Sequence, residues 1–154
     1  MTQPMTLEQL FARVQSAWDD ARGQRAMPRR ADIDAVKLGS ALQHVSVIDV
    51  VPGDPVDFRY RVLGQQLIKG YGLNLTGQLH TVVADRSLPA WPYYEAYVSC
   101  ATTGRAQSID AQTRNRKKIL VNVKGRVWPL SDDGKTVSGL LGAGMYFVPE
   151  MLTA

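Results

Sequence analysis

Three segments with the composition of β-strands follow one another in the last third of the chain, and this run restricts the fold more than any other feature. The strands are predicted at residues 107–113, 119–129 and 137–148. Two short polar stretches separate them, as expected for turns between antiparallel neighbours. A long helix before this run, and two further strands at 43–51 and 57–64, predict an α+β fold: one five-stranded antiparallel sheet with helices on one face.

The N-terminal region is predicted to form an amphipathic helix. Thr6 and Gln9 have the spacing of a capping box, and apolar residues then recur every three or four positions until Gly23. The apolar stripe includes Leu10, Phe11, Val14 and Trp18. Because such a stripe has to be buried, it is predicted to be an interaction surface that packs against the sheet, against a second subunit in a homodimer, or against both.

The second predicted strand alternates strictly between two kinds of side chain. Phe58, Tyr60 and Val62 fall on one face, whereas Arg59 and Arg61 fall on the other. The first face is expected to join the core. The arginine face is expected to be solvated or ion-paired.

The composition fits a single compact unit in the cytoplasm. The 154 residues, 45% of them hydrophobic, can build one core, and we expect an N-terminal helix and connector over 1–27 followed by a domain over 28–150. Cys100 is the only cysteine, which excludes an internal disulfide and favours a reducing compartment. No apolar signal region opens the sequence, and the longest uncharged run, 137–148, is shorter than the roughly 20 residues that a membrane helix needs.

Charged and metal-binding residues point to no particular chemistry. The net charge of +4 is a mild excess that does not require a nucleic-acid partner. The densest basic run, 114–118, has no interleaved aromatic residue on which bases could stack, so we interpret it as a solvated hairpin loop. The two histidines, His44 and His80, lie far apart in the sequence, and neither a metal site nor a histidine-based catalytic motif is predicted.

Two motifs identify a family. Residues 28–34 are Pro-Arg-Arg-Ala-Asp-Ile-Asp, and residues 57–64 are Asp-Phe-Arg-Tyr-Arg-Val-Leu-Gly. Together with the order of the predicted elements, these motifs resemble the short, single-domain PAS-like proteins of bacteria. The resemblance implies a non-catalytic sensory or regulatory module. In such a module a small molecule binds between the sheet and the helices, and a homodimer or a signalling-protein partner carries the output.

The carboxylates of the first motif have two candidate roles. Asp32 or Asp34 can cap the helix predicted to start near Asp32, or either can form an ion pair with Arg30. Capping is the simpler interpretation, because an N-cap alone contributes about 1 kcal/mol.

The phase of the predicted strands and helices indicates which side chains would face a PAS-like cavity. The expected lining residues are Val47, Phe58, Tyr60, Leu67, Tyr71, Trp91, Tyr94, Tyr97, Val121, Val123 and Met145. The alternative is a filled core in which these side chains only pack, which would make the chain a structural protein–protein adapter. A small enzyme using the same cavity is a third hypothesis, but the sequence offers no triad, metal cluster or paired catalytic carboxylates.

The resemblance also allows two PAS cofactors to be tested against the sequence. Haem-binding relatives use a histidine on the long helix, and residues 87–103 contain none. Photosensing flavin relatives use an Asn-Cys-Arg-Phe-Leu type of motif, whereas Cys100 is preceded by Val-Ser and followed by Ala. Neither haem nor a photosensing flavin is therefore expected, and the ligand stays unknown.

Overall fold

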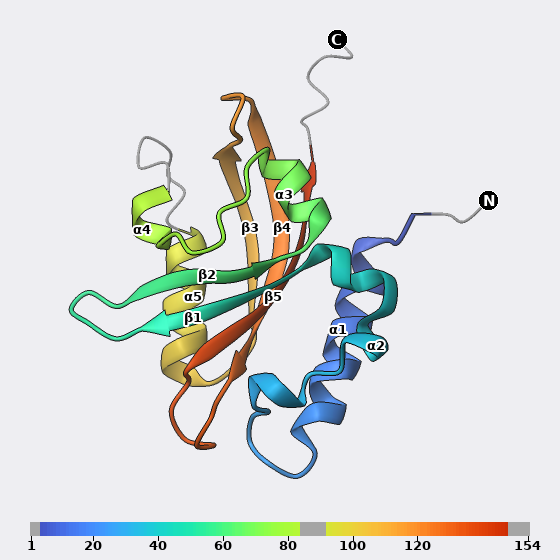
Figure 1. Cartoon of the computed structure of the whole chain (residues 1–154), viewed down its shortest axis with the longest axis vertical. Coiled ribbons are helices and arrows are strands. Elements are labelled where there is room, and N and C mark those ends of the chain that lie inside the picture. The colour runs from blue at the N-terminus through green and yellow to red at the C-terminus, as the bar shows by residue number, and fades with distance from the viewer. Residues whose placement is uncertain (1–3, 84–91, 148–154) are drawn as a thin grey trace.

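The computed structural model describes residues 4–83 and 92–147, and its centre is one antiparallel sheet (Figure 1). The strands are β1 (Val45–Val51), β2 (Asp57–Leu63), β3 (Gln107–Arg114), β4 (Leu120–Leu130) and β5 (Gly139–Phe147). Their order across the sheet is β2-β1-β5-β4-β3, so β2 and β3 are the edges. The predicted five-stranded antiparallel sheet is confirmed, and every predicted strand boundary lies within two residues of the observed one.

Within residues 4–83 and 92–147, five α-helices and two 3₁₀ turns surround the sheet. The helices are α1 (Leu7–Arg22), α2 (Ala35–Leu38), α3 (Gln65–Tyr71), α4 (His80–Val83) and α5 (Pro92–Thr103), and the 3₁₀ turns are Arg30–Asp32 and Gly39–His44. The predicted capping box of α1 is confirmed, because the Thr6 hydroxyl accepts the Gln9 N–H at 3.1 Å and the Gln9 side chain accepts the Thr6 N–H at 2.9 Å. Helix α4 was not predicted. Among the described helices, none has both the length and the apolar character needed to cross a bilayer.

Helices cover both faces of the sheet. Helix α5 lies over one face, where its side chains join Ile48, Val127 and Leu140 in a buried cluster. Helix α1 lies against the opposite face, as Figure 1 shows, and packs there on a second cluster that includes Trp128 and Leu141. The N-terminal helix and the sheet therefore share a core.

The apolar stripe of α1 is used inside the chain. Leu10 and Val14 have no exposed surface, and Phe11 and Trp18 pack against the same cluster. Trp18 also donates its indole N–H to the carbonyl of Pro129 at 2.9 Å. Of the alternatives predicted for this stripe, packing against the sheet is the one the structure shows, and Leu10 and Val14 have no area left to offer a second subunit while α1 stays on the sheet.

A β-bulge changes the phase of β2. Tyr60 and Val62 pair with consecutive residues of β1, which leaves Arg61 as an extra residue between them. As a result Val62 turns toward solvent, with 41% of its surface exposed, and Leu63 faces the α5 side of the sheet instead. The prediction that Val62 shares the core face of Tyr60 is therefore wrong.

The arginines of β2 differ in their partners: Arg61 is ion-paired, as one of the two expectations had it, whereas Arg59 binds a backbone carbonyl. Arg61 donates from Nε to the carboxylate of Asp49 at 2.7 Å. Arg59 donates to the carbonyl oxygen of Gly77 at 2.9 Å, which ties the segment after α3 to the sheet edge.

The two carboxylates of the 28–34 motif divide the predicted roles between them. Asp34 is the N-cap of α2, and its side chain accepts the backbone N–H two residues further on at 2.9 Å. Asp32 instead binds the guanidinium groups of Arg25 at 2.6 Å and Arg29 at 3.1 Å. Hydrogen bonds from these two arginines hold the pKa of Asp32 well below its usual range, and the bond from Arg29 has the larger effect. Arg30 pairs with neither carboxylate in these contacts and lies 4.0 Å from Asp49.

Candidate functional site: a cavity lined by tyrosine hydroxyls

A cavity of about 80 Å³ lies between the sheet and the helices α3 and α5. Five tyrosines from four elements line it: Tyr60 of β2, Tyr71 of α3, Tyr93 and Tyr97 of α5, and Tyr146 of β5. The apolar part of the wall consists of Leu63, Leu67, Leu73, Leu75, Ile109, Val123 and Val127. A single buried water needs roughly 10–15 Å³ of such space, so the cavity can hold a few waters or one small organic molecule.

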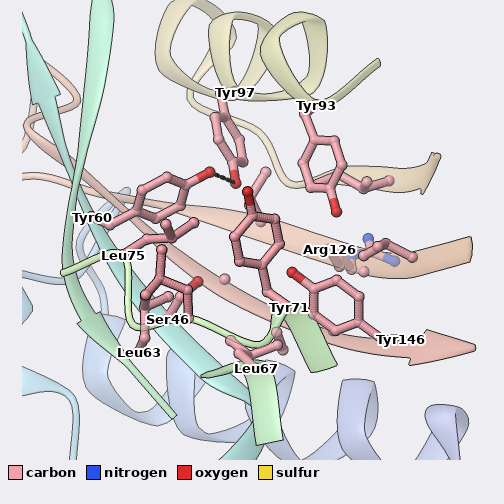
Figure 2. A pocket seen from close by; sticks show the side chains of 18 residues that line it. Ser46, Tyr60, Leu63, Leu67, Tyr71, Leu75, Tyr93, Tyr97, Arg126 and Tyr146 are labelled. Carbon is pink, nitrogen blue, oxygen red and sulfur yellow. Dashed lines mark hydrogen bonds between the residues drawn. The ribbon is translucent and has the colours of Figure 1, made fainter. Parts of the chain in front are cut away.

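The phenol groups point toward the same space (Figure 2). The hydroxyl oxygens of Tyr60 and Tyr97 lie 3.4 Å apart, and those of Tyr93 and Tyr146 extend into the cavity from the helix and from the sheet. Burial raises the pKa of Tyr60 and of Tyr93 well above the usual value and raises the pKa of Tyr97 to about 12. These phenols therefore keep their protons near neutral pH and can donate hydrogen bonds.

His80 is not a lining residue of the cavity, but it contacts the lining residue Tyr60. Its Nδ1 lies 2.9 Å from the Tyr60 hydroxyl oxygen, and its ring is stacked on Tyr94 with an interplanar angle of 10°. The side chain is 4% exposed, and burial lowers its pKa to about 4. The imidazole is consequently neutral at physiological pH and fixes the orientation of the Tyr60 hydroxyl.

Contacts between β2 and the segment around α4 hold His80 in place. The Tyr60 N–H donates to the carbonyl of Gln78 at 3.0 Å, and the Gly77 N–H donates to the carbonyl of Tyr60 at 2.6 Å. Thr81 donates both its N–H, at 3.3 Å, and its hydroxyl to the carboxylate of Asp57. The described part of helix α4 is four residues long and depends on these tertiary contacts, because so short a helical segment is unstable by itself.

The floor of the cavity is open because three of its residues are glycines. Gly125 of β4 and Gly142 and Gly144 of β5 line the cavity with backbone atoms. A Cβ atom on Gly142 would lie 2.3 Å from the hydroxyl oxygen of Ser46, which also lines the cavity. Larger residues at these positions would fill the space or collide with the neighbouring strands.

Tyr146 closes the cavity at one end, and its position depends on a glycine in α3. A Cβ atom on Gly70 would come within 2.4 Å of the Tyr146 ring. The absence of that atom lets the ring lie directly on the helix. A backbone hydrogen bond fixes the turn after α3. The Arg116 N–H from the β3–β4 loop donates to the carbonyl of Tyr71 at 2.6 Å. The 114–118 hairpin loop, interpreted from sequence as solvated, thus also contacts α3.

Five of the eleven residues expected to line a pocket do lie at this cavity. These are Tyr60, Leu67, Tyr71, Tyr97 and Val123. Val47 and Met145 lie on the opposite face of the sheet with the α1 cluster, which corrects their assignment. The strands that carry them are covered on both faces, and an apolar sequence does not reveal which face a residue takes.

The remaining expected residues lie beside the cavity or outside the described residues. Phe58 is fully buried in the α5 cluster, and Tyr94 donates its hydroxyl to the carbonyl of Val56. Val121 is buried two positions before Val123 on β4. None of these three is a lining residue of the described cavity, so their assignment is also corrected. Trp91 lies outside the described residues.

Sequence reasoning missed several residues of the site. They include Ser46, Leu63, Tyr93, Tyr146, the three floor glycines and the supporting His80. Strand alternation would have found Ser46, which is two positions before the buried Ile48. Tyr93 lies four positions before Tyr97, which is the spacing of one helix face, so the helical period would have placed it beside Tyr97. No local signal places His80, because its partner Tyr60 is twenty residues away.

The described residues offer little for metal or thiol chemistry. No group of three or more histidine, cysteine, aspartate or glutamate side chains is placed to hold a metal ion in the described part of the chain. Cys100 on α5 has no exposed surface and packs in the α5 cluster, and burial raises the pKa of its thiol to about 12. It is an inert thiol in the core.

A small α+β domain with a cavity between its sheet and its helices is the architecture of PAS and Light-Oxygen-Voltage domains. The model of the PAS domain family matches residues 3–144. The chain therefore belongs to the PAS domain family. No curated protein matches the sequence.

Solved structures with the same fold include several Light-Oxygen-Voltage domains. The light-state structure of the blue-light photoreceptor Aureochrome1 LOV has a TM-score of 0.56 and 15% identity, over 76% of this chain and 91% of that one. A Light-Oxygen-Voltage domain studied with a flavin analogue has a TM-score of 0.57 and 17% identity, over 73% and 82% of the two chains. The Rhodobacter sphaeroides LOV protein has a TM-score of 0.57 and 8% identity, over 96% and 72%. At these identities the likeness concerns the fold alone.

A flavin does not fit the cavity in this arrangement of side chains. A cavity of about 150 Å³ accommodates a single benzene ring, whereas this cavity of about 80 Å³ would have to take three fused rings. Cys100 is also not among the lining residues.

Proposed function

We propose that this PAS domain is a non-catalytic sensory module of the cytoplasm that binds a small, uncharged molecule in the tyrosine-lined cavity. The observation that carries the proposal is the convergence of five phenol groups from four different elements on one space. Aromatic residues that only fill a core do not need to bring their hydroxyls together, and each buried hydroxyl requires a hydrogen-bond partner.

The groups around the cavity favour a neutral hydrogen-bond acceptor. No aspartate or glutamate is among the described lining residues, and the phenols of Tyr60, Tyr93 and Tyr97 keep their protons. Protonated phenols can donate to a carbonyl, amide or ether oxygen. A ligand with a full charge would pay a large desolvation cost, because the side chain of the one basic lining residue, Arg126, lies over the ring of Trp128 on the α1 face of the sheet.

Isosteric probes of different charge test this proposal. Acetamide and acetate have nearly the same shape, and only acetate is charged at neutral pH. We expect saturable shifts of the tyrosine side-chain resonances of the protein in NMR titrations with acetamide and none with acetate. Native mass spectrometry of freshly purified protein provides a second measurement, in which a reproducible additional mass identifies a retained ligand.

A matched pair of variants locates the binding. Leu67 lines the cavity, whereas its neighbour Ile68 on α3 is similarly half-buried and does not. Leu67→Trp should fill the cavity and abolish the acetamide shifts, and Ile68→Trp should retain them. If the wild-type protein shows neither a retained mass nor saturable shifts, the chain is better described as an adapter with a filled core.

A further inference from the structure

A second and much larger depression lies on the other side of Tyr146. This groove of about 1100 Å³ runs between α1, the 3₁₀ turn at Gly39–His44, α3 and the end of β5. Figure 1 shows α1 and α3 on either side of the final strand at this end of the molecule. The groove is distinct from the cavity, and among the described residues that line the two, only Tyr146 belongs to both.

All charged side chains among the described lining residues of the groove are positive. Arg13 of α1 and Lys69 of α3 are exposed and face the groove from its two sides. Among the described residues that line it there is no aspartate or glutamate. The other polar lining residues are Gln9, Ser40, Gln43, His44, Gln66 and the hydroxyl-bearing Tyr146.

The same groove has an apolar base. Met5, Met145 and Phe147 line it, and Phe147 keeps 40% of its surface exposed although it is a large aromatic residue. Met5 and Met145 are partly buried, and flexible methionine side chains can adapt to different apolar partners. An apolar base with cations at the rim is complementary to a helix that has one apolar and one acidic face.

We propose that this groove docks an acidic amphipathic segment of a partner protein. Apolar side chains of that segment would contact Met145 and Phe147, while its carboxylates would pair with Arg13 and Lys69. The cationic rim steers an acidic segment toward the groove and repels a basic one. A second copy of this chain is a poorer occupant, because its net charge of +4 and the same cationic rim would face the groove.

Synthetic peptides test the proposal directly. The probe is a fluorescent helical peptide with leucines on one face and glutamates on the other, and its binding to the full chain is followed by fluorescence anisotropy. One control peptide has lysine in place of each glutamate, and another has alanine in place of each leucine. We expect only the first peptide to bind, with an affinity that falls as the salt concentration rises.

A matched pair of double variants assigns the site. Arg13→Gln with Lys69→Gln removes both rim cations, and we expect the peptide to bind about tenfold more weakly. Lys117→Gln with Lys118→Gln removes two exposed cations from the β3–β4 loop and should leave the affinity unchanged. All four side chains are exposed, so both proteins should fold.

Three results would overturn the proposal. The first is equal binding of the acidic and basic peptides, and the second is an equal loss of affinity in the two double variants. The third is self-association of the wild-type chain in sedimentation experiments that the Arg13 and Lys69 substitutions abolish, which would assign the groove to a second copy. Retention of acetamide binding in each of these cases would show that the cavity proposal stands independently.

Discussion

The buried imidazole of His80 connects the stability of this domain to pH. In the folded state its pKa is about 4, whereas an exposed histidine has a pKa of about 6.5. Between these values the unfolded chain binds a proton at His80 that the folded chain does not bind. The stabilisation is therefore complete above pH 6.5 and is lost as the pH falls to about 4. The free energy of unfolding should decrease by about 3 kcal/mol over this interval.

Urea denaturation at a series of pH values checks this expectation. His80→Gln cannot titrate and should lose most of the slope between pH 6.5 and 4. Burial also lowers the pKa of His44, the only other histidine, but His44 is less buried, so His44→Gln should retain the larger part of the slope. A His80 side chain whose NMR resonances titrate near pH 6.5 in the folded protein would contradict the assignment.

Gly70 provides a second test at the level of one residue. In an exposed helix, replacing glycine by alanine stabilises the protein by up to about 1 kcal/mol. Here the added methyl group would meet the ring of Tyr146 at 2.4 Å. We therefore expect Gly70→Ala to have the opposite sign and to lower the free energy of unfolding by about 1–3 kcal/mol.

Thermal or urea denaturation distinguishes the two signs for Gly70→Ala. Lys69→Ala, one position earlier on the exposed side of α3, should change the stability by no more than about 0.5 kcal/mol. A stabilised Gly70→Ala protein would mean that Tyr146 does not rest on this helix.

At the scale of the elements, α1 is part of the folding unit. Leu10 is fully buried against the sheet, so Leu10→Ala should lower the free energy of unfolding by about 2–5 kcal/mol. Because the contacts are within one chain, this loss should be the same at low and at high protein concentration. Ala12→Ser, on an exposed position of the same helix, is the control. A loss that appears only at high concentration would instead place Leu10 in a subunit interface.

The elements were easier to predict from the sequence than the faces they present. Strand positions followed from runs of apolar residues bounded by turns, and the boundaries of α1 followed from its capping box and Gly23. The phase of β2 did not follow, because the bulge at Arg61 moves Val62 to the outside and Leu63 to the cavity. Alternation predicts a face only as long as the register is unbroken.

The lining residues of the cavity were also predictable only in part, because the sequence does not reveal which face of an element each residue takes. Tyr71 of α3 and Tyr97 of α5 were found because each helix has one side that can face the sheet, whereas Tyr93 was missed and Tyr94 was misplaced. Val47 and Met145 were misplaced because β1 and β5 are buried on both faces, by α5 and by α1. His80 could not be found, since α4 is held by contacts with β2 rather than by its own sequence.

For the whole molecule, the essential feature is that the cavity and the groove share one side chain. The Tyr146 hydroxyl points into the cavity, while its ring rests on Gly70 and borders the groove. A molecule that displaces the hydroxyl would move the ring against α3 and change the shape of the groove. If both proposals hold, ligand binding and partner binding are then coupled, and the coupling has to be reciprocal.

Filling the cavity should imitate a ligand and reveal this coupling. We expect Leu67→Trp to press Tyr146 toward the groove and to weaken binding of the acidic peptide about fivefold, a coupling at the low end of the usual range. Ile68→Trp adds the same bulk to α3 outside the cavity and should leave the affinity unchanged. In the wild-type protein, the peptide should also shift the ¹⁹F resonance of fluorotyrosine at position 146, assigned by its loss in Tyr146→Phe. Equal peptide affinities for the two tryptophan variants, with no shift at position 146, would show that the two sites act independently, because the one described residue that lines both of them would not respond.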